Sequence, residues 1–179
     1  MRLRRLMGVA DQIVASRFSS IDLSNKADYH PRYTEQTLTM WRLSKETALG
    51  LPEPHSLTSH RYYLNRILAP SHRIFLAIEK ESDSVLGMMA MDKDYISQLY
   101  IHPSHQCRGI GSALVELAQE NADQLKLYTF EINLPARAFW EKHGFQEQEI
   151  GQHDNEEGLT DILCKWRREP ASISMHFAM

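Results

Sequence analysis

The chain has 179 residues, of which 42% are hydrophobic and 24% charged, and this composition is typical of one globular domain with a sizeable core. A formal net charge of -3 and an isoelectric point near 6.3 argue against nucleic acid or an anionic membrane as a partner. The two cysteines, Cys107 and Cys164, are too few for a disulfide framework, so a cytoplasmic location is expected.

The first twenty residues, MRLRRLMGVADQIVASRFSS, predict a strand over Arg2 to Leu6 and then a helix that begins at Asp11. The residues expected on its buried face are Ile13, Val14, Phe18 and Ile21. Arginine and serine are also typical of a cleaved organelle presequence, but Asp11 argues against one. No apolar run here is long enough for a membrane span, so a soluble protein is expected.

Residues 24–70 predict two helical segments joined by an exposed connection at Leu49 to Ser56, which holds two prolines. The apolar residues of the first segment are Leu38, Trp41 and Leu43. Those of the second are Tyr63, Leu64, Ile67 and Leu68, and this segment should end before Pro70, which cannot continue a helix. The apolar runs IFLAIE and VLGMMAMD then flank the polar turn KESDS and predict an antiparallel hairpin.

Residues 96–114, ISQLYIHPSHQCRGIGSAL, predict a strand, a bend at Pro103 and a helix whose start carries the pattern Q-x-x-G-x-G. The first amides of a helix lack internal partners and lie at the positive end of its dipole, so residues 107–112 are suited to bind a pyrophosphate. The alternative is a capped helix with a tight entry turn and no ligand. A P-loop would need a Lys after Gly111, and a dinucleotide fingerprint would need a small residue where Leu114 stands. Neither of these motifs fits.

Residues 125–145, LKLYTFEINLPARAFWEKHGF, predict a strand, a short helix and a glycine stop at Gly144. The expected apolar face of the helix is Ala136, Phe139 and Trp140. A second hairpin follows, with an acidic turn over His153 to Gly158 and a strand over Thr160 to Trp166. The turn is either an acidic rim that attracts cationic molecules or an ordinary solvated turn.

Three segments, IHP, QCRGIG and NLPARAFWEKHGF, together resemble the motifs of the GNAT superfamily of acyl-CoA-dependent N-acetyltransferases. The resemblance runs from the IFLAIE strand to Trp166 and implies an α/β GNAT fold. Such a fold has a mixed, mostly antiparallel central sheet with splayed fourth and fifth strands, flanked by helices. We therefore expect one domain over residues 1–167 and a C-terminal tail over 168–179.

The resemblance also implies acetyl-CoA as co-substrate, with no metal. Its pantetheine arm would pair with the strand over residues 99–101, and the N–H of Tyr100 would stabilise the tetrahedral oxyanion. Asn133 is either a polar contact to the pantetheine or only a helix cap, and His105 and Arg108 are candidates to balance phosphate charge. The cofactor-binding residues implied are Leu99, Tyr100, Ile101, Gln106, Cys107, Arg108, Gly109, Ile110, Gly111, Ser112, Asn133 and Trp140.

The chain departs from the family pattern at the catalytic positions. Trp140 stands where relatives usually have a Tyr that protonates the departing thiolate, and an indole N–H cannot do this. The usual carboxylate base is replaced by Tyr95 and Tyr128. Glu131 is the first candidate for the base and Tyr128 for an acid or a water-holding group; the others are Asp92, Asp94 and His153.

The function implied is transfer of an acetyl group from acetyl-CoA to a primary amine of a small molecule or peptide, by direct attack and without an acyl-enzyme. The alternative is a non-catalytic acyl-CoA-binding or sensing module, which the missing Tyr and carboxylates would favour. A dinucleotide oxidoreductase is a third interpretation, and NAD binding would support it. The protein is expected to be a monomer or a homodimer.

Overall fold

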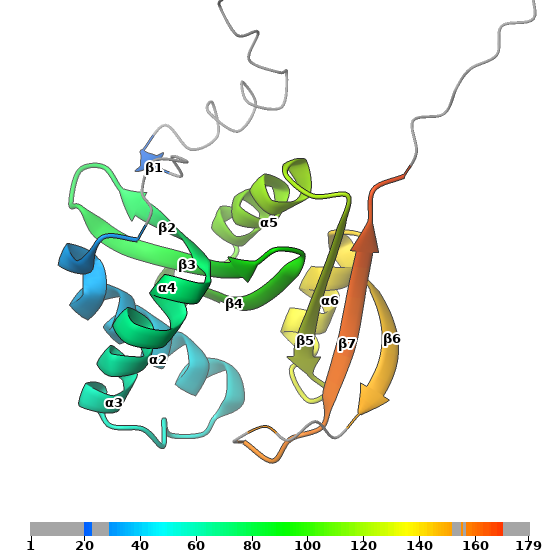
Figure 1. Ribbon diagram of the computed structural model, residues 1–179, viewed down its shortest axis with the longest axis horizontal. Helices are drawn as coiled ribbons and strands as arrows, with labels where there is room; N and C mark the ends of the chain where they lie inside the picture. Colours follow the sequence, from blue (N-terminus) through cyan, green and yellow to red (C-terminus); the bar gives the residue numbers. More distant parts are fainter. Residues whose placement is uncertain (1–19, 23–28, 152–154, 156, 170–179) are drawn as a thin grey trace, which may run out of the picture. The chain divides into compact units, whose positions relative to one another are not determined.

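The computed structural model describes residues 20–22, 29–151, 155 and 157–169. The chain divides into two units, Met1–Ala118 and Gln119–Met179 (Figure 1), so the single domain over 1–167 stays a prediction. The predicted strand at Arg2 to Leu6, the helix after Asp11 and the end of the tail lie outside the described residues. Ile21 was predicted on that helix but lies in strand β1 (Ile21–Asp22), because it pairs with Glu79.

The first unit contains an antiparallel sheet in the order β1-β2-β3-β4. Its longer strands are β2 (Arg73–Glu79), β3 (Ser84–Asp92) and β4 (Tyr95–Ile101). The interiors of β2 and β3 are buried on both faces, which explains their unbroken apolar sequence. The predicted hairpin is therefore confirmed.

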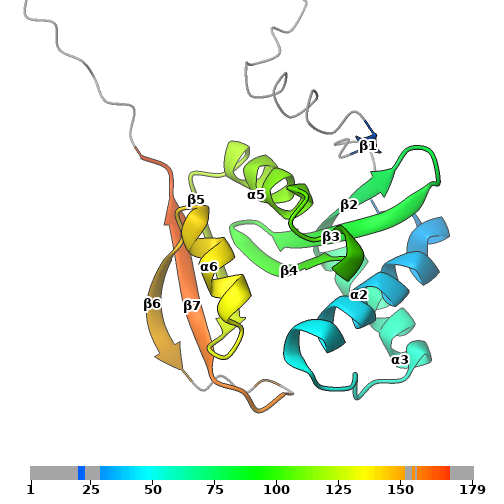
Figure 2. The same ribbon diagram turned by 180° about the vertical axis from the view of Figure 1, so that it is seen from behind.

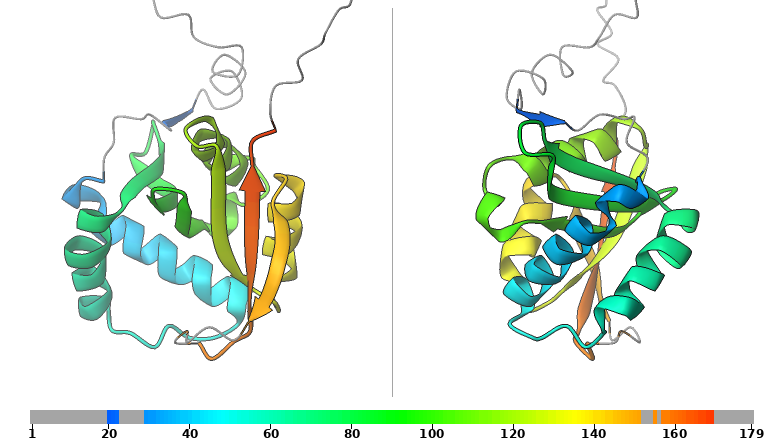
Figure 3. Two further views of the ribbon diagram at one scale, coloured as in Figure 1. Left: turned by 45° about the vertical axis from the view of Figure 1, so that its right-hand side comes forward. Right: turned by 90° about the vertical axis from the view of Figure 1, so that its left-hand side faces the viewer.

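A 3-10 turn, η1 (Pro31–Tyr33), leads into helix α2 (Thr34–Leu49), which packs against β3 and β4 (Figure 3). The start of α2 is tied to the turn between β2 and β3. Tyr33 donates its hydroxyl to Asp83 Oδ1 at 2.7 Å, and Gln36 Nε2 donates to the Asp83 carbonyl at 3.2 Å. Gln36 Oε1 accepts from Val85 N at 2.9 Å, so this one side chain bonds both the turn and the strand that follows it.

Helix α2 contains the three apolar residues named from the sequence and buries Leu38 and Trp41, whereas Leu43 is 41% exposed. A residue five positions after Leu38 lies on a different side of a helix with 3.6 residues per turn. The helix ends at Gly50, whose φ of 66° is a left-handed conformation that favours glycine.

The second helical segment consists of α3 (Leu57–Tyr62), the π-helical turn η2 (Tyr63–Leu68) and α4 (Ala69–Ser71). It continues through Pro70, so the prediction that it ends before this residue is wrong. The wider π-helical turn just before Pro70 accommodates a ring that would otherwise clash with the preceding helical turn. Leu64 and Leu68 are buried, whereas Tyr63 and Ile67 are partly exposed.

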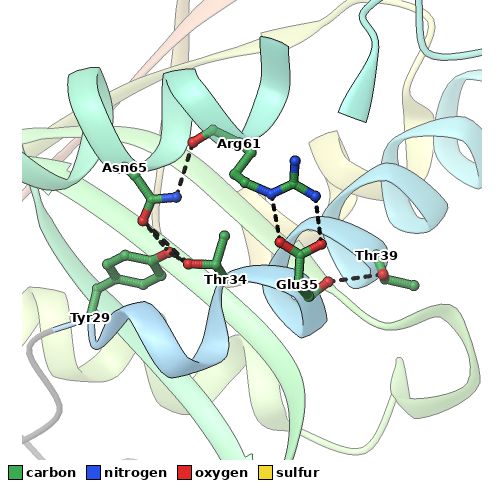
Figure 4. A network of polar contacts seen from close by, with 6 residues as sticks. All are labelled: Tyr29, Thr34, Glu35, Thr39, Arg61 and Asn65. Carbon is green, nitrogen blue, oxygen red and sulfur yellow. Dashed lines mark hydrogen bonds and ion pairs between the residues drawn. The ribbon is translucent and has the colours of Figure 1, made fainter. Parts of the chain in front are cut away.

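A polar network joins α2 to this segment (Figure 4). Arg61 forms a two-point ion pair with Glu35, with distances of 2.6 Å and 2.9 Å. Asn65 Oδ1 accepts from the hydroxyls of Tyr29 at 2.9 Å and Thr34 at 3.2 Å, and its Nδ2 donates to the Arg61 carbonyl at 3.0 Å. The network holds the π-helical turn against the start of α2.

The second unit contains a sheet in the order β5-β7-β6, with every pair antiparallel. Its elements are β5 (Gln124–Phe130), α6 (Leu134–Lys142), β6 (Gln146–Gly151) and β7 (Asp161–Arg167). Helix α6 covers one face of this sheet (Figure 2). The predicted second hairpin is confirmed, although residues 153, 154 and 156 of its turn lie outside the described residues. In the part of the chain that is described, no helix has the length and apolarity needed to span a membrane.

Candidate functional site

Strand β4 carries the first group of predicted cofactor-binding residues. Leu99, Tyr100 and Ile101 are half-buried and pair with residues 87–89 of β3. They occupy the last strand of the first unit's sheet and end directly before the loop that leads to helix α5 (Ile110–Glu120). The predicted order of strand, bend and helix is therefore confirmed.

Gly87 of β3 supports the end of β4 and was missed by the sequence analysis. A Cβ atom there would lie 2.6 Å from Ile101 Cδ1 and 3.2 Å from the Tyr100 carbonyl oxygen. A larger residue here would require the Ile101 side chain to move and the backbone of β4 to shift slightly. The signal was present, because an isolated glycine inside an apolar strand indicates close approach of another group.

The loop between β4 and α5 is bonded back onto the strand. It contains the 3-10 turn η3 (Pro103–His105), followed by Gln106, whose Nε2 donates to the Ile101 carbonyl at 3.2 Å. Cys107 and Gly109 have φ values of 58° and 87°, so the chain turns sharply twice on either side of Arg108. These turns bring the backbone to the start of α5.

Helix α5 begins with Ile110, Gly111 and Ser112, which supply the first-turn amides predicted to bind the pyrophosphate. Ala113 N donates to the Gly109 carbonyl at 3.0 Å, so regular helical bonding starts at Gly109. Eleven residues of helix place a positive dipole end at this loop. A loop in which left-handed residues alternate with an ordinary one, followed directly by the start of a helix, is a geometry that binds anions.

Of the two cations predicted near the phosphates, Arg108 fits better than His105. Arg108 lies in the loop itself and its side chain is exposed. Burial lowers the pKa of His105, and the neighbouring Arg108 and His102 lower it further, so its imidazole is neutral at pH 7. Both ring nitrogens of His105 are buried without a hydrogen-bond partner in the described ranges. A neutral ring contributes no charge to phosphate binding.

The second unit carries the remaining predicted residues at the end of β5 and along α6. Asn133 Oδ1 accepts from Ala136 N at 3.2 Å, so the side chain caps α6. Tyr128 lies in β5 opposite Leu163 of β7 and is 40% exposed. Glu131 lies in the turn between β5 and α6, and its N–H donates to the Thr160 carbonyl at 2.9 Å.

Arg137 holds this turn and was also missed by the sequence analysis. Its Nη1 donates to the Glu131 carbonyl at 3.1 Å. Its Nε and Nη2 donate to the two carboxylate oxygens of Glu147 on β6, at 2.7 Å and 3.1 Å. A two-point pair of this kind fixes the plane of the guanidinium. One side chain therefore connects α6, β6 and the residue predicted as general base.

Trp140 is 7% exposed and packs inside the second unit. Its ring centroid lies 5.1 Å from that of Phe139 and 5.1 Å from that of Phe145, and it is in edge-to-face contact with both rings. Gly144, which ends this segment, has a φ of 80°, as the predicted glycine stop requires. The observed contacts of Trp140 are those of a core aromatic residue.

An aromatic cluster borders β4 in the first unit. Trp41 of α2 stacks on Tyr100 with ring centroids 5.6 Å apart, and it contacts His60 of α3 at 4.3 Å and Tyr63 of η2 at 6.2 Å. The sequence predicted Trp41 in this helix as an apolar residue, but no sequence signal connected it with His60 or Tyr100.

Each unit thus brings together its own share of the predicted residues. The first unit joins the end of β4, the loop and the start of α5; the second carries Tyr128 on β5, Glu131 in the turn that follows and Asn133 at the start of α6. That both groups bind one acetyl-CoA molecule stays a prediction. Among the described residues, no group of three or more His, Cys, Asp or Glu side chains is arranged to hold a metal ion.

The model of the acetyltransferase (GNAT) family matches residues 37–145, which include β4, the loop, α5 and α6. The peptidyl-lysine N-acetyltransferase YiaC of Escherichia coli (strain K12) is 27% identical over 88 residues, which cover 49% of this chain and 60% of that protein. The alignment thus spans less than two thirds of that relative's length.

Solved structures share the fold. An acetyltransferase from Thermus thermophilus has a TM-score of 0.64 and 21% identity, and the match covers 83% of this chain and 97% of that one. The PaiA N-acetyltransferase from Thermoplasma acidophilum, in complex with coenzyme A, has a TM-score of 0.64 and 16% identity, with coverages of 83% and 99%. The predicted fold and the predicted resemblance are both confirmed.

Proposed function

The chain belongs to the GNAT acetyltransferase family, and we propose that it transfers the acetyl group of acetyl-CoA to a primary amine of a small molecule or peptide. The observation that supports this most directly is the loop over residues 106–111. It is bonded back to β4 and turns twice through left-handed backbone before α5 begins. This shape fits the pyrophosphate of acetyl-CoA.

In the proposed mechanism the backbone of residues 99–101 pairs with the pantetheine arm, and a main-chain N–H, assigned to Tyr100 by the resemblance, stabilises the oxyanion. The residues that surround the phosphates are those of the loop and the helix start, Gln106, Cys107, Arg108, Gly109, Ile110, Gly111 and Ser112. Asn133 caps α6 through Oδ1, and a polar contact to the pantetheine would add to that observed role.

The acceptor's ammonium first loses a proton, for which Glu131 is the proposed base, acting directly or through water. The free amine nitrogen then bonds to the thioester carbon, and the carbon–sulfur bond breaks with its electron pair going to sulfur. The thiolate takes up a proton to give CoA. A thiol pKa of about 8.5 makes this sulfur a tolerable leaving group near neutrality, with or without an acid such as Tyr128.

Neither cysteine is needed as a nucleophile. Cys164 is buried, and burial raises the pKa of its thiol to about 11, so it carries almost no thiolate at neutral pH. Cys107 is exposed in the loop proposed to bind phosphate. Direct attack by the amine requires no acyl-enzyme.

A non-catalytic acyl-CoA-binding module is the second candidate. The burial of Trp140 between Phe139 and Phe145 favours it, because an indole in that position supplies packing and no acid. Binding of acetyl-CoA is common to both candidates, so turnover decides between them.

The name of the E. coli relative suggests the lysine side chain of a peptide as one acceptor to test. The decisive experiment incubates acetyl-CoA and protein with a lysine peptide, amino acids, polyamines and simple alkylamines, and measures free CoA and acetylated product. We expect acetyl-CoA to raise the melting temperature, while NAD and ATP do not, since a ligand of the native state stabilises it by mass action.

Replacing Gly111 with Val should remove the acetyl-CoA-dependent shift, because a branched side chain blocks approach of the pyrophosphate to the backbone. Binding without turnover on any acceptor would support the non-catalytic module. No shift with acetyl-CoA would contradict both candidates.

A further inference from the structure

We propose that Trp41 and His60 form a recognition site for the backbone amide of a peptide acceptor, with Trp41 donating to its carbonyl and His60 accepting from its N–H. This proposal rests on the proposed function and narrows its acceptor to a peptide. It is carried by two buried polar groups that have no hydrogen-bond partner among the described residues.

Trp41 is 4% exposed and His60 is 7% exposed. Nε1 of Trp41 and Nδ1 of His60 are both buried, and neither has a hydrogen-bond partner in the described part of the chain. An unsatisfied buried donor or acceptor costs about 1–3 kcal/mol, so natural proteins rarely keep two of them in contact. The centroids of the two rings lie 4.3 Å apart, and the rings are in an edge-to-face arrangement.

The two nitrogens have complementary chemistry. An indole N–H only donates. Burial lowers the pKa of His60, and although Glu53 opposes this, Arg42, Lys45 and His55 lower it further. The imidazole is therefore neutral near pH 7, and with its proton on Nε2 it presents Nδ1 as an acceptor. A donor on one ring and an acceptor on the ring that it contacts match an amide group, which offers a carbonyl and an N–H.

The position also fits an acceptor. Trp41 stacks on Tyr100, the β4 residue whose N–H is proposed to bind the thioester oxygen, at 5.6 Å between ring centroids. Tyr63, on the π-helical turn, has its ring centroid 6.2 Å from that of Trp41 and is 39% exposed, so this member of the cluster lies at the surface. A π-helical turn interrupts the regular bonding of a helix and is frequent at functional sites.

The ring of Tyr100 provides apolar contact, while the nitrogens of Trp41 and His60 provide orientation. A simple alkylamine has no amide group, so it could use only the apolar contact. A peptide uses both, so loss of either nitrogen should affect peptides and leave alkylamines unchanged.

The experiment measures kcat and KM of the full chain with two acceptors, the peptide acetyl-Gly-Lys-Gly-amide and n-butylamine, which has the lysine side chain's amine without amide groups. In Trp41→Phe we expect KM for the peptide to rise about 3- to 10-fold, the effect of one lost neutral hydrogen bond. KM for n-butylamine should stay within about twofold. The melting temperature should not fall by more than a smaller ring explains, because Nε1 has no partner to lose among the described residues.

His60→Leu should have the same selective effect, whereas His60→Asn should recover part of the peptide KM, since its amide oxygen can occupy the place of Nδ1. Thr37→Val is a matched control, because Thr37 is fully buried on the same helix and its Oγ1 also has no partner among the described residues. It should change neither KM.

Equal effects on both acceptors in Trp41→Phe and His60→Leu, or none on either, would overturn the amide site while leaving acetyl transfer intact. If the wild-type protein acetylates n-butylamine and not the peptide, the amide site is also wrong. If it acetylates no acceptor although it binds acetyl-CoA, the proposed function itself fails.

Discussion

The side chain of Gln106 is bonded to the end of strand β4: its Nε2 donates to the carbonyl oxygen of Ile101 at 3.2 Å. The resemblance implied Gln106 as a cofactor contact, and the structure shows it also as the anchor of the loop. One amide thus connects the strand proposed to bind the pantetheine with the loop proposed to bind the pyrophosphate.

Gln106→Met keeps the length of this side chain and removes the donor, so we expect the affinity for acetyl-CoA to fall about 3- to 10-fold. Gln106→Glu should weaken binding further, because its carboxylate faces a carbonyl oxygen and repels phosphate. Calorimetric titration with CoA measures both. Wild-type affinity in Gln106→Met would mean that the loop keeps its shape without the anchor.

Arg137 and Glu147 allow a charge-swap test of the turn at Glu131. Arg137→Glu with Glu147→Arg restores an ion pair between α6 and β6, worth about 0.5 kcal/mol at a partly exposed site. The swap cannot restore the bond to the Glu131 carbonyl, because a glutamate at 137 has no proton to donate.

We therefore expect the double variant to regain the part of the unfolding free energy that the ion pair contributes, but to keep the reduced kcat expected of Arg137→Gln. Urea unfolding and turnover of the best acceptor measure the two quantities. If kcat recovers together with stability, Arg137 only joins α6 to β6.

The two thiols should differ in reactivity. Cys107 is exposed, whereas Cys164 is buried and burial raises its pKa to about 11. Iodoacetamide at about pH 8 should label Cys107 and leave Cys164 unlabelled in the native protein, as mass spectrometry of peptides would show. Saturating acetyl-CoA should slow labelling of Cys107. Unchanged labelling with bound acetyl-CoA would place the phosphates away from this loop.

Trp140→Tyr tests whether the leaving thiolate needs an acid. If an acid helps, this variant should raise kcat by up to about 10²-fold with little change in KM for acetyl-CoA. Trp140→Phe is the matched control, because phenylalanine has the ring of tyrosine without the hydroxyl. Equal kcat in the two variants would show that turnover does not wait for thiolate protonation.

The pKa of His60 predicts a loss of stability in acid. Burial lowers its pKa in the folded protein below the ordinary value of 6.5, so the unfolded chain binds the proton first as the pH falls. The stabilisation is complete above pH 6.5 and decreases as the pH falls through the lowered folded value. Urea unfolding between about pH 5 and 7.5 should show a smaller decrease in His60→Asn than in the wild type. Parallel curves would mean that His60 accepts protons equally in both states.

The sequence by itself determined the elements that depend on local chemistry. The apolar runs on each side of KESDS predicted β2 and β3, and the glycines after Gln106 predicted the start of α5. Asn133 and Gly144 predicted the two ends of the α6 segment. In each case the residues that produce the element lie within it or next to it in the sequence. They are alternating or continuous apolar residues, a capping residue, or a residue that tolerates positive φ.

The tertiary structure alone decided what depends on residues distant in the chain. Pro70 did not end its helix because a π-helical turn, bonded through Asn65 to Tyr29 and Thr34, makes room for it. Nothing in the sequence predicts the contact between Trp41 and His60 or the bond from Arg137 to Glu131. Their cause is the packing of one element against another, and packing depends on three-dimensional neighbours that sequence spacing does not encode.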